Sequence, residues 1–315
     1  MSRVIAVVGA TGAQGGGLVQ AILNDPAREF VPRALTRKPD SEAARRLADA
    51  GAEVVRADMD DQASLTQAFQ GCHGAFCLTN FWEHFSAEKE KEQAQRLATA
   101  AAEAGIGHAI WSTLEDTRER LPVSDDRMPV LQGKYNVPHF DAKGEADQYF
   151  RDSGVPTTFL LTSFYWENFI YFGSGPQKGP DGKLALVLPM GDARLPGIGV
   201  ADIGKCALGV FKAGAEYRGK TVAIAGGHYS GQEMADLMTA ALGQPVGYTA
   251  VPADVYRSFP FDGADEMGNM YQYKRDFNES FCGIRDLATA RKINPELQSL
   301  AAWLDANGSR IPLGD

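Results

Sequence analysis

The chain has 315 residues, of which 44% are hydrophobic and 23% charged, the balance of a soluble globular protein. Acidic residues outnumber basic ones by 40 to 31, and the formal net charge of −9 disfavours a direct nucleic-acid partner. No apolar run approaches the ~20 residues of a membrane span, and the start lacks a signal-peptide pattern. We therefore expect a cytoplasmic protein with no membrane partner.

The cysteine and histidine patterns give no sign of a metal site. The 4 cysteines include no CxxC pair, and no two histidines have metal-ligand spacing. Because a chain of this length does not need disulfides to fold, we expect reduced thiols and no bound metal.

The predicted elements alternate between strands and helices. The apolar run Val4–Val8 predicts a first strand buried on both faces, and Leu18–Leu23 predicts a helix after it. In the helix expected at 87–104, small and apolar side chains recur on one face at helical spacing. Further strands are expected at 31–35, 53–55, 74–79, 108–111 and 157–161, and a further helix at 140–151. This alternation predicts an α/β fold, a Rossmann-type doubly wound parallel sheet.

Two regions depart from this alternation. Segment 114–138 has charges and three prolines but no clear period, which is typical of a functional or a mobile loop. After Asn168 the pattern changes, with Gly and Pro clustered at 173–182 and short strands expected at 184–188 and 221–225. We therefore expect a Rossmann domain at 1–168. Residues 169–315 would form a second, smaller α/β lobe, from which the chain returns to the edge of the sheet.

A glycine-rich segment with GxxGxxG spacing follows the first strand and opens the first helix. Glycines at these positions allow a tight turn and let backbone amides approach a pyrophosphate at a helix N-terminus. The alternative is a glycine-rich turn that binds nothing. The residues predicted to hold the cofactor here are Gly9, Ala10, Thr11, Gly12, Ala13, Gln14 and Gly15.

The end of the second strand favours NADP(H) over NAD(H). An acidic residue there would bind the ribose hydroxyls, whereas the sequence has Arg37 and Lys38, with no acid before Asp40. A guanidinium offers a planar fork for the 2′-phosphate, and Lys38 adds positive charge. The alternative is that Arg37 is a solvated surface residue.

Polar residues also follow the third and fourth strands. Asp61 and Gln62 stand where an adenine would lie, and Thr79, Asn80 and Phe81 would border the nicotinamide ribose. Because polar residues at strand ends also cap helices, a purely structural role is the alternative.

The segment His139-Phe140-Asp141-Ala142-Lys143 stands where short-chain dehydrogenases have Tyr-x-x-x-Lys. The lysine, which holds the nicotinamide ribose in those enzymes, is kept, and histidine replaces the tyrosine. Histidine can act as a general acid, and Ser112 at the end of the fifth strand could supply a hydroxyl partner. The candidate catalytic residues are therefore His139, Lys143 and Ser112. The alternative for His139 is a packing role or a place in the cofactor's lining.

Taken together, these motifs resemble the NmrA-like family of atypical short-chain dehydrogenases, and above all its branch of NADP-sensing regulators. The resemblance covers nearly the whole chain. It rests on GATGAQGG, LTRKP, GAEVVRADMDDQ, LTNFWE, HFDAKGEADQYFRDSGVPTT, FYWENF and PQKGPDGK, and continues through GVADIGKCALGVF and DLATARKINPELQSLAAWL.

The resemblance implies further cofactor contacts and one departure. It implies contacts from residues 9–14, Arg37, Asp61, Gln62, Thr79, Asn80, Phe81 and Lys143, and adds Tyr165, Trp166, Glu167 and Asn168 beside the nicotinamide. The sensor branch also has a cofactor-contacting lysine after the fourth strand, where this chain has Glu92. Lys89 and Lys91 are the candidates to replace it.

Two functions follow from the resemblance. The favoured one is an NADP(H)-binding redox sensor that acts through a regulatory protein partner and has weak or no dehydrogenase activity. The alternative is an NADPH-dependent reductase of a quinone-like or other flat acceptor, its pocket lined by aromatic residues of 164–172; ordinary packing is the alternative for that cluster. The sequence leaves open whether the chain forms a homodimer.

Overall fold

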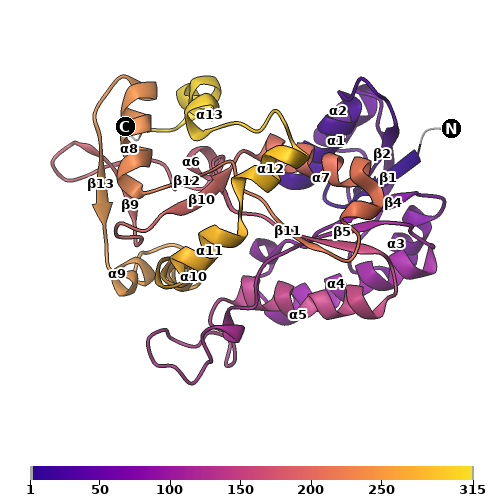
Figure 1. The fold of residues 1–315 in the computed structure, drawn as a ribbon, viewed down its shortest axis with the longest axis horizontal. Helices are drawn as coiled ribbons and strands as arrows, with labels where there is room; N and C mark the ends of the chain where they lie inside the picture. Colours follow the sequence, from indigo (N-terminus) through magenta and orange to yellow (C-terminus); the bar gives the residue numbers. More distant parts are fainter. Residues whose placement is uncertain (1–2, 314–315) are drawn as a thin grey trace. The chain divides into compact units, whose positions relative to one another are not determined.

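The central element of the computed structural model, which describes residues 3–313, is a seven-stranded sheet with the order β11-β6-β5-β4-β1-β2-β3 (Figure 1). The five neighbouring pairs from β6 to β3 are all parallel. The strand order reverses between β1 and β4, as in doubly wound folds. The strands are β1 Arg3–Val7, β2 Phe30–Thr36, β3 Glu53–Arg56, β4 Gly74–Cys77, β5 Ala109–Thr113, β6 Thr157–Leu161 and β11 Thr221–Ala223. The predicted Rossmann-type sheet is confirmed.

The chain divides into two compact units. The first contains residues up to Asp116, with His139–Thr162 and Ile203–Val222; the second contains Thr117–Pro138, Ser163–Asp202 and the residues from Ala223 onward. The chain therefore passes between the two units several times. The division into two domains at residue 168 stays a prediction.

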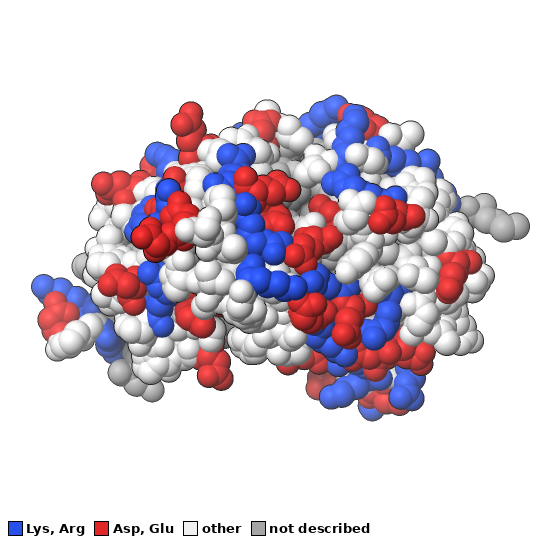
Figure 2. All heavy atoms as spheres, turned by 90° about the horizontal axis from the view of Figure 1, so that it is seen from below, with Lys and Arg blue, Asp and Glu red and all other residues white. Residues whose placement is uncertain are grey.

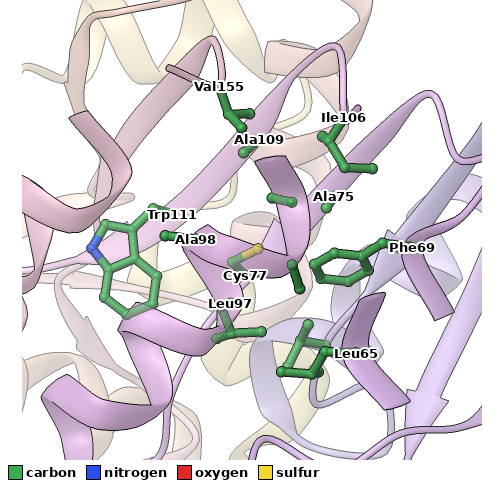
Figure 3. Close-up of a cluster of buried hydrophobic side chains, with 14 of the residues drawn as sticks. Leu65, Phe69, Ala75, Cys77, Leu97, Ala98, Ile106, Ala109, Trp111 and Val155 are labelled. Atoms are coloured by element: carbon green, nitrogen blue, oxygen red, sulfur yellow. The ribbon is translucent and has the colours of Figure 1, made fainter. Parts of the chain in front are cut away.

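Two groups of helices cover the sheet of the first unit. Leu65 and Phe69 of α3 and Leu97 of α4 pack in one cluster with side chains of β4 and β5 (Figure 3). Phe150 of α5 and side chains of β1, β2 and β6 belong to the same cluster. On α7, a Cβ at Gly204 would lie 2.1 Å from the carbonyl carbon of Gly17 on α1, so these two helices cross at glycines. The helices are α1 Ala13–Leu23, α2 Glu42–Asp49, α3 Gln62–Phe69, α4 Ala87–Glu103, α5 Pro138–Asp152 and α7 Val200–Ala213.

Alternation along the strands explains how both faces are buried. Ala75 and Cys77 of β4 belong to the cluster in Figure 3, while Phe76 between them is also fully buried. Successive strand residues point to opposite faces, so a strand covered on both sides must be apolar throughout. The short continuous apolar runs in the sequence therefore mark these strands correctly.

The second unit has two three-stranded sheets, with the orders β12-β10-β7 and β13-β9-β8. Its strands are β7 Phe164–Tyr165, β8 Gln177–Lys178, β9 Leu184–Leu188, β10 Leu195–Ile198, β12 Gly227–Tyr229 and β13 Val246–Ala250. Its helices are α6 Asn168–Tyr171, α8 Gly231–Leu242, α9 Ala253–Arg257, α10 Ala264–Asp276, α11 Asn278–Ile284, α12 Leu287–Ile293 and α13 Leu300–Asn307.

Segment 117–138 is held in place by side chains of α10. The Asn269 amide donates to the backbone oxygens of Pro129 and Asn136, at 2.8 and 2.7 Å. Gln272 donates to the backbone oxygen of Arg127 at 2.7 Å. The segment is irregular, and side chains distant in sequence satisfy three of its backbone oxygens, a pattern that local periodicity does not show. Its expected role as a functional or a mobile loop stays a prediction.

Among the helices of residues 3–313, none combines the length and the hydropathy that a transmembrane span requires. Acidic and basic side chains are interspersed on the face drawn in Figure 2. An ion pair also joins α4 to α5, where Lys91 lies 2.7 Å from Glu145.

Candidate functional site in the first unit

The turn after β1 needs glycine at two positions. Gly9 has φ +63°, a left-handed conformation that side chains strain, and its carbonyl accepts from the Gly12 amide at 2.9 Å. At Gly15, a Cβ would lie 2.4 Å from the Gly9 oxygen and 2.6 Å from the Val8 oxygen. The GxxGxxG spacing thus matches a turn in which α1 packs directly on the end of β1.

The start of α1 suits an anion. Gly12 is the N-cap residue, and within the described chain no side chain caps this helix and no acidic residue stands in its first turn. The N-terminal amides of a helix attract negative charge through their partial positive charge. Gln14 in the same turn accepts a hydrogen bond from Ser112 at 2.8 Å, which joins two predicted site residues.

Arg37 lies just beyond β2 and is paired with Glu83 of the 3-10 helix Phe81–Glu83 (η1). The hydrogen bond to Glu83 raises the pKa of Arg37 above its usual value. The side chains of the pair are 50% and 41% exposed, so an incoming anion can reach the guanidinium. Beside it, the Lys38 amide donates to the Thr36 hydroxyl at 3.1 Å, which fixes the backbone at the end of β2.

The residues after β3 have evident structural roles. Asp61 caps α3 by accepting from the Ser64 amide at 3.2 Å. The side-chain amide of Gln62, the first residue of α3, donates to the Arg96 backbone oxygen and accepts from the Ala100 amide of α4, both at 3.2 Å. Helix capping is thus observed for Asp61, and a contact with the adenine stays a prediction for both residues.

Lys143 of α5 meets Thr79, which follows β4, and Glu90 of α4. The Lys143 ammonium lies 2.6 Å from Glu90 Oε1, 2.7 Å from the Thr79 hydroxyl and 3.1 Å from the Thr79 backbone oxygen. The Thr79 hydroxyl in turn donates to Glu90 Oε1 at 2.7 Å. Two residues predicted to border the nicotinamide ribose therefore lie together, with a third that the sequence did not indicate.

Glu90 is fully buried, at 0% exposure. Burial opposes its ionisation, but the charge of Lys143 and the hydrogen bonds around it lower the pKa of Glu90 to about 2. On its other side, Glu90 Oε2 lies 3.5 Å from Nε2 of His84. The His84 Nδ1 atom accepts from the Ser86 amide at 3.1 Å, so in the neutral ring the proton is on Nε2, facing Glu90.

The sequence contains a signal that could have identified Glu90. Ala87, Ala94 and Leu97 lie on the buried face of α4, and Glu90 falls on the same face three residues after Ala87. A carboxylate within an apolar stripe must find a partner, because an unpaired buried charge is very costly. The partner, Lys143, lies on another helix and cannot be found from the local pattern.

His139 belongs to an aromatic cluster with the residues after β4. Its ring centroid lies 5.0 Å from that of Trp82 and 5.7 Å from that of Phe81. His139 and Phe81 are buried, whereas Trp82 is 40% exposed and Phe85, against both Phe81 and Trp82, is 42% exposed. Packing is therefore an observed role of His139, and catalysis stays a prediction.

Two polar side chains at the end of β5 are tied down. Ser112 is buried and donates to Gln14, as described above. Thr113 donates to Asp147 of α5 at 2.6 Å, and the Trp111 indole donates to the same carboxylate at 3.0 Å. These bonds fix α5, and with it Lys143, against the carboxyl end of β5.

Residues 165–168 lie in the second unit. Trp166 is 1% exposed and packs against Trp303, and the Glu167 carboxylate accepts from the Trp303 indole at 3.0 Å and from the Val200 amide at 2.9 Å. Phe164 and Phe169 of the same aromatic segment are also buried. Packing is thus observed for these side chains, and the cofactor contacts of Tyr165, Trp166, Glu167 and Asn168 stay predictions.

The lysines near Glu92 have acidic partners. Lys89 lies 2.7 Å from Asp60, while Lys91 lies 2.7 Å from Glu145. Burial disfavours the charge on Asp60, but hydrogen bonds from Lys89 and Gln93 outweigh it and lower the pKa of Asp60. Replacement of the family lysine by either residue stays a prediction. Among residues 3–313, no group of three or more His, Cys, Asp or Glu side chains is placed to hold a metal ion.

A seven-stranded sheet whose first crossover carries a GxxGxxG turn defines a Rossmann-type protein. Residues 1–304 match the model of the NmrA-like family. The NmrA-like family domain-containing oxidoreductase FrzB of Cladobotryum sp. is 33% identical over 241 residues, which are 70% of this chain and 68% of FrzB. The chain therefore belongs to the NmrA-like family.

Solved structures agree on the fold. NmrA, a negative transcriptional regulator, in complex with NADP has a TM-score of 0.77 at 22% identity, over 96% of this chain and 94% of that chain. The triphenylmethane reductase of Citrobacter sp. complexed with NADP(H) has a TM-score of 0.74 at 20% identity, over 98% of this chain and 100% of that chain.

Proposed function

We propose that the first unit binds NADP(H), with the pyrophosphate on the Gly9–Gly15 turn and the 2′-phosphate on Arg37. The observation that carries this proposal is the glycine turn itself. It has a left-handed Gly9, a close approach at Gly15 and an uncapped helix start in the described chain. The solved complexes of NmrA with NADP and of triphenylmethane reductase with NADP(H) support it.

In this proposal the nicotinamide ribose lies near Thr79 and Lys143. Their observed contact places an ammonium and a hydroxyl at the carboxyl end of β4, beside Asn80 and Phe81. Ligands of doubly wound sheets bind outside this edge, near the point where the strand order reverses. Lys38, Asp61, Gln62 and residues 165–168 complete the predicted set of contacts.

We further propose that the protein acts as a cytoplasmic redox sensor, which signals whether NADP(H) is bound and turns over a substrate slowly or not at all. In a Tyr-x-x-x-Lys pair, the lysine charge favours release of the tyrosine proton. Here Lys143 is compensated by Glu90 at 2.6 Å, and its neighbour at the tyrosine position is a histidine packed between aromatic rings. A regulatory protein or a second copy of the chain would then respond to the bound form.

A second candidate is an NADPH-dependent reductase of a flat acceptor. It is favoured by the oxidoreductase FrzB and by the aromatic cluster of Phe81, Trp82, Phe85 and His139, since exposed rings offer a stacking surface. NADPH would supply the hydride. The protein's part would be to hold the acceptor against Trp82 and to deliver a proton from His139, or from a water near Ser112.

Steady-state oxidation of NADPH with a panel of quinones and triphenylmethane dyes separates the two functions. The sensor predicts slow or no turnover, and an increase with His139→Tyr, which restores the phenol of the dehydrogenase pair. Turnover of many per second by the wild type, abolished by His139→Phe without loss of NADPH binding, would establish the reductase instead.

A further inference from the structure

Glu90 is a buried acid to which neither proposed function assigns a part in holding the cofactor. It is 0% exposed, while its neighbours in sequence on the same helix, Glu88 and Glu92, have side chains 60% and 57% exposed. A buried carboxylate costs free energy unless it is paired and hydrogen-bonded. Besides His84, its partners are Lys143 and Thr79, two residues that the sequence assigned to the cofactor.

The geometry around Lys143 is saturated. An ammonium has three hydrogens, and three acceptors lie within 3.1 Å of it: Glu90 Oε1, the Thr79 hydroxyl and the Thr79 backbone oxygen. A ribose hydroxyl can therefore bind Lys143 only if one of these acceptors gives way. The Thr79 hydroxyl can do so most easily, because it has its own hydrogen bond to Glu90 at 2.7 Å.

We propose that Glu90 is a positioning residue, which holds the Lys143 ammonium at the end of β4 so that a cofactor ribose hydroxyl can replace Thr79 as an acceptor. This inference rests on the proposed binding of NADP(H) in the first unit. A lysine side chain is long and loses considerable rotamer entropy when it is fixed. The ion pair with Glu90 fixes the Lys143 side chain before the cofactor binds. The opposite charges of Glu90 and Lys143 leave the pair neutral.

The simplest test of Lys143, its replacement by methionine, would mislead. It would leave the Glu90 carboxylate buried without a cation, which is more damaging than the loss of the pair. Any loss of binding in Lys143→Met could then reflect damage to the fold. Removing both charges avoids this, because the double variant Glu90→Gln/Lys143→Met has no unpaired buried charge.

The experiment is a double-mutant cycle on NADP⁺ affinity by calorimetry. The proteins are wild type, Glu90→Gln, Lys143→Met and the double variant, with thermal unfolding of each as a check of the fold. We expect Glu90→Gln to weaken NADP⁺ binding about tenfold when Lys143 is present, the loss of one charge-assisted hydrogen bond. In the Lys143→Met background, the same change should have no effect or partly restore binding. If Lys143→Met does not fold, Lys143→Gln takes its place, because its amide can still donate to Glu90.

Glu88→Gln is the matched control on the same helix, and we expect it to bind NADP⁺ like the wild type. An unchanged affinity in Glu90→Gln would overturn the inference, and so would an equal loss with and without Lys143, the mark of a merely structural role. Failure of the proposed function looks different, because the wild type itself would then not bind NADP⁺.

Discussion

Glu83 competes for Arg37, the residue assigned to the 2′-phosphate. Their ion pair is about half exposed, and such pairs contribute ~0–1 kcal/mol. We expect Glu83→Gln to free the guanidinium and tighten NADP⁺ binding by up to about fivefold, with NAD⁺ affinity unchanged. Calorimetric titration of both cofactors measures this, and equal tightening of the two would show that Glu83 does not act through Arg37.

At the scale of single residues, the sequence indicates which residues belong to the candidate site better than it indicates which side chains contact one another. It assigned Thr79 and Lys143 to one part of the cofactor, and the structure brings them within 2.7 Å. It did not indicate Glu90, because an acid in a helix is usually solvated and its partner is distant in sequence. His139 was singled out for its place at the tyrosine position, but the sequence did not indicate its contacts with Phe81 and Trp82 after β4.

At the scale of elements, the glycine turn gives the sharpest contrast between neighbouring positions. A Cβ at Gly15 would lie 2.4 Å from the Gly9 oxygen, whereas one at Gly16 would lie 3.3 Å from the Ala10 oxygen. We expect Gly15→Ala to displace α1 from β1, lower the melting temperature by several degrees and weaken NADP⁺ binding at least tenfold. Gly16→Ala is the control and should fold and bind almost normally. Normal binding by Gly15→Ala would contradict this account of the turn.

The start of β5 provides a test by pH. His108 is buried and its Nε2 lies 2.8 Å from the Thr158 hydroxyl, which donates to the Tyr217 backbone oxygen, so His108 Nε2 is the donor. Burial, with the charge of Arg218 and the proximity of His73, lowers the pKa of His108 to about 4. Because the unfolded chain binds this proton near pH 6.5, stability is lost as the pH falls from 6.5 to 4, by about 3 kcal/mol in all.

His108→Gln keeps a donor toward Thr158 and removes the titration. We expect the wild type to lose more unfolding free energy than the variant when the pH is lowered from 7 to 5. Urea unfolding at the two pH values measures it. A difference that does not depend on pH would show that His108 titrates alike in the folded and unfolded chain.

The elements that the sequence predicted well are those whose hydrogen bonds and packing follow a local period. Strands β1 and β4 consist mainly of short apolar runs, and α4 buries Ala94 and Leu97 on the predicted face. Segment 117–138 could not be predicted in this way, because Asn269 and Gln272 of α10 satisfy its backbone oxygens from far along the chain.

At the scale of the whole molecule, the first unit contains most of the residues assigned to NADP(H). The turn at Gly9–Gly15, Arg37 and the Thr79–Lys143 contact all belong to it, and only residues 165–168 come from the second unit. The doubly wound topology explains this, since consecutive strands of the sheet end at one edge. Binding is therefore expected to depend first on residues of this unit.

Calorimetric titration of NADP⁺ and NAD⁺ into the wild type and Arg37→Ala tests the central claim most directly. The exposed Arg46 of α2, which pairs with Glu42, supplies the control Arg46→Ala. We predict that the wild type prefers NADP⁺ and that Arg37→Ala loses roughly 1.5–3 kcal/mol of NADP⁺ binding free energy, the range for a charge-assisted contact. Its affinity for NAD⁺ should hardly change. Equal losses for both cofactors, or a wild type without preference, would contradict the assignment of the 2′-phosphate to Arg37.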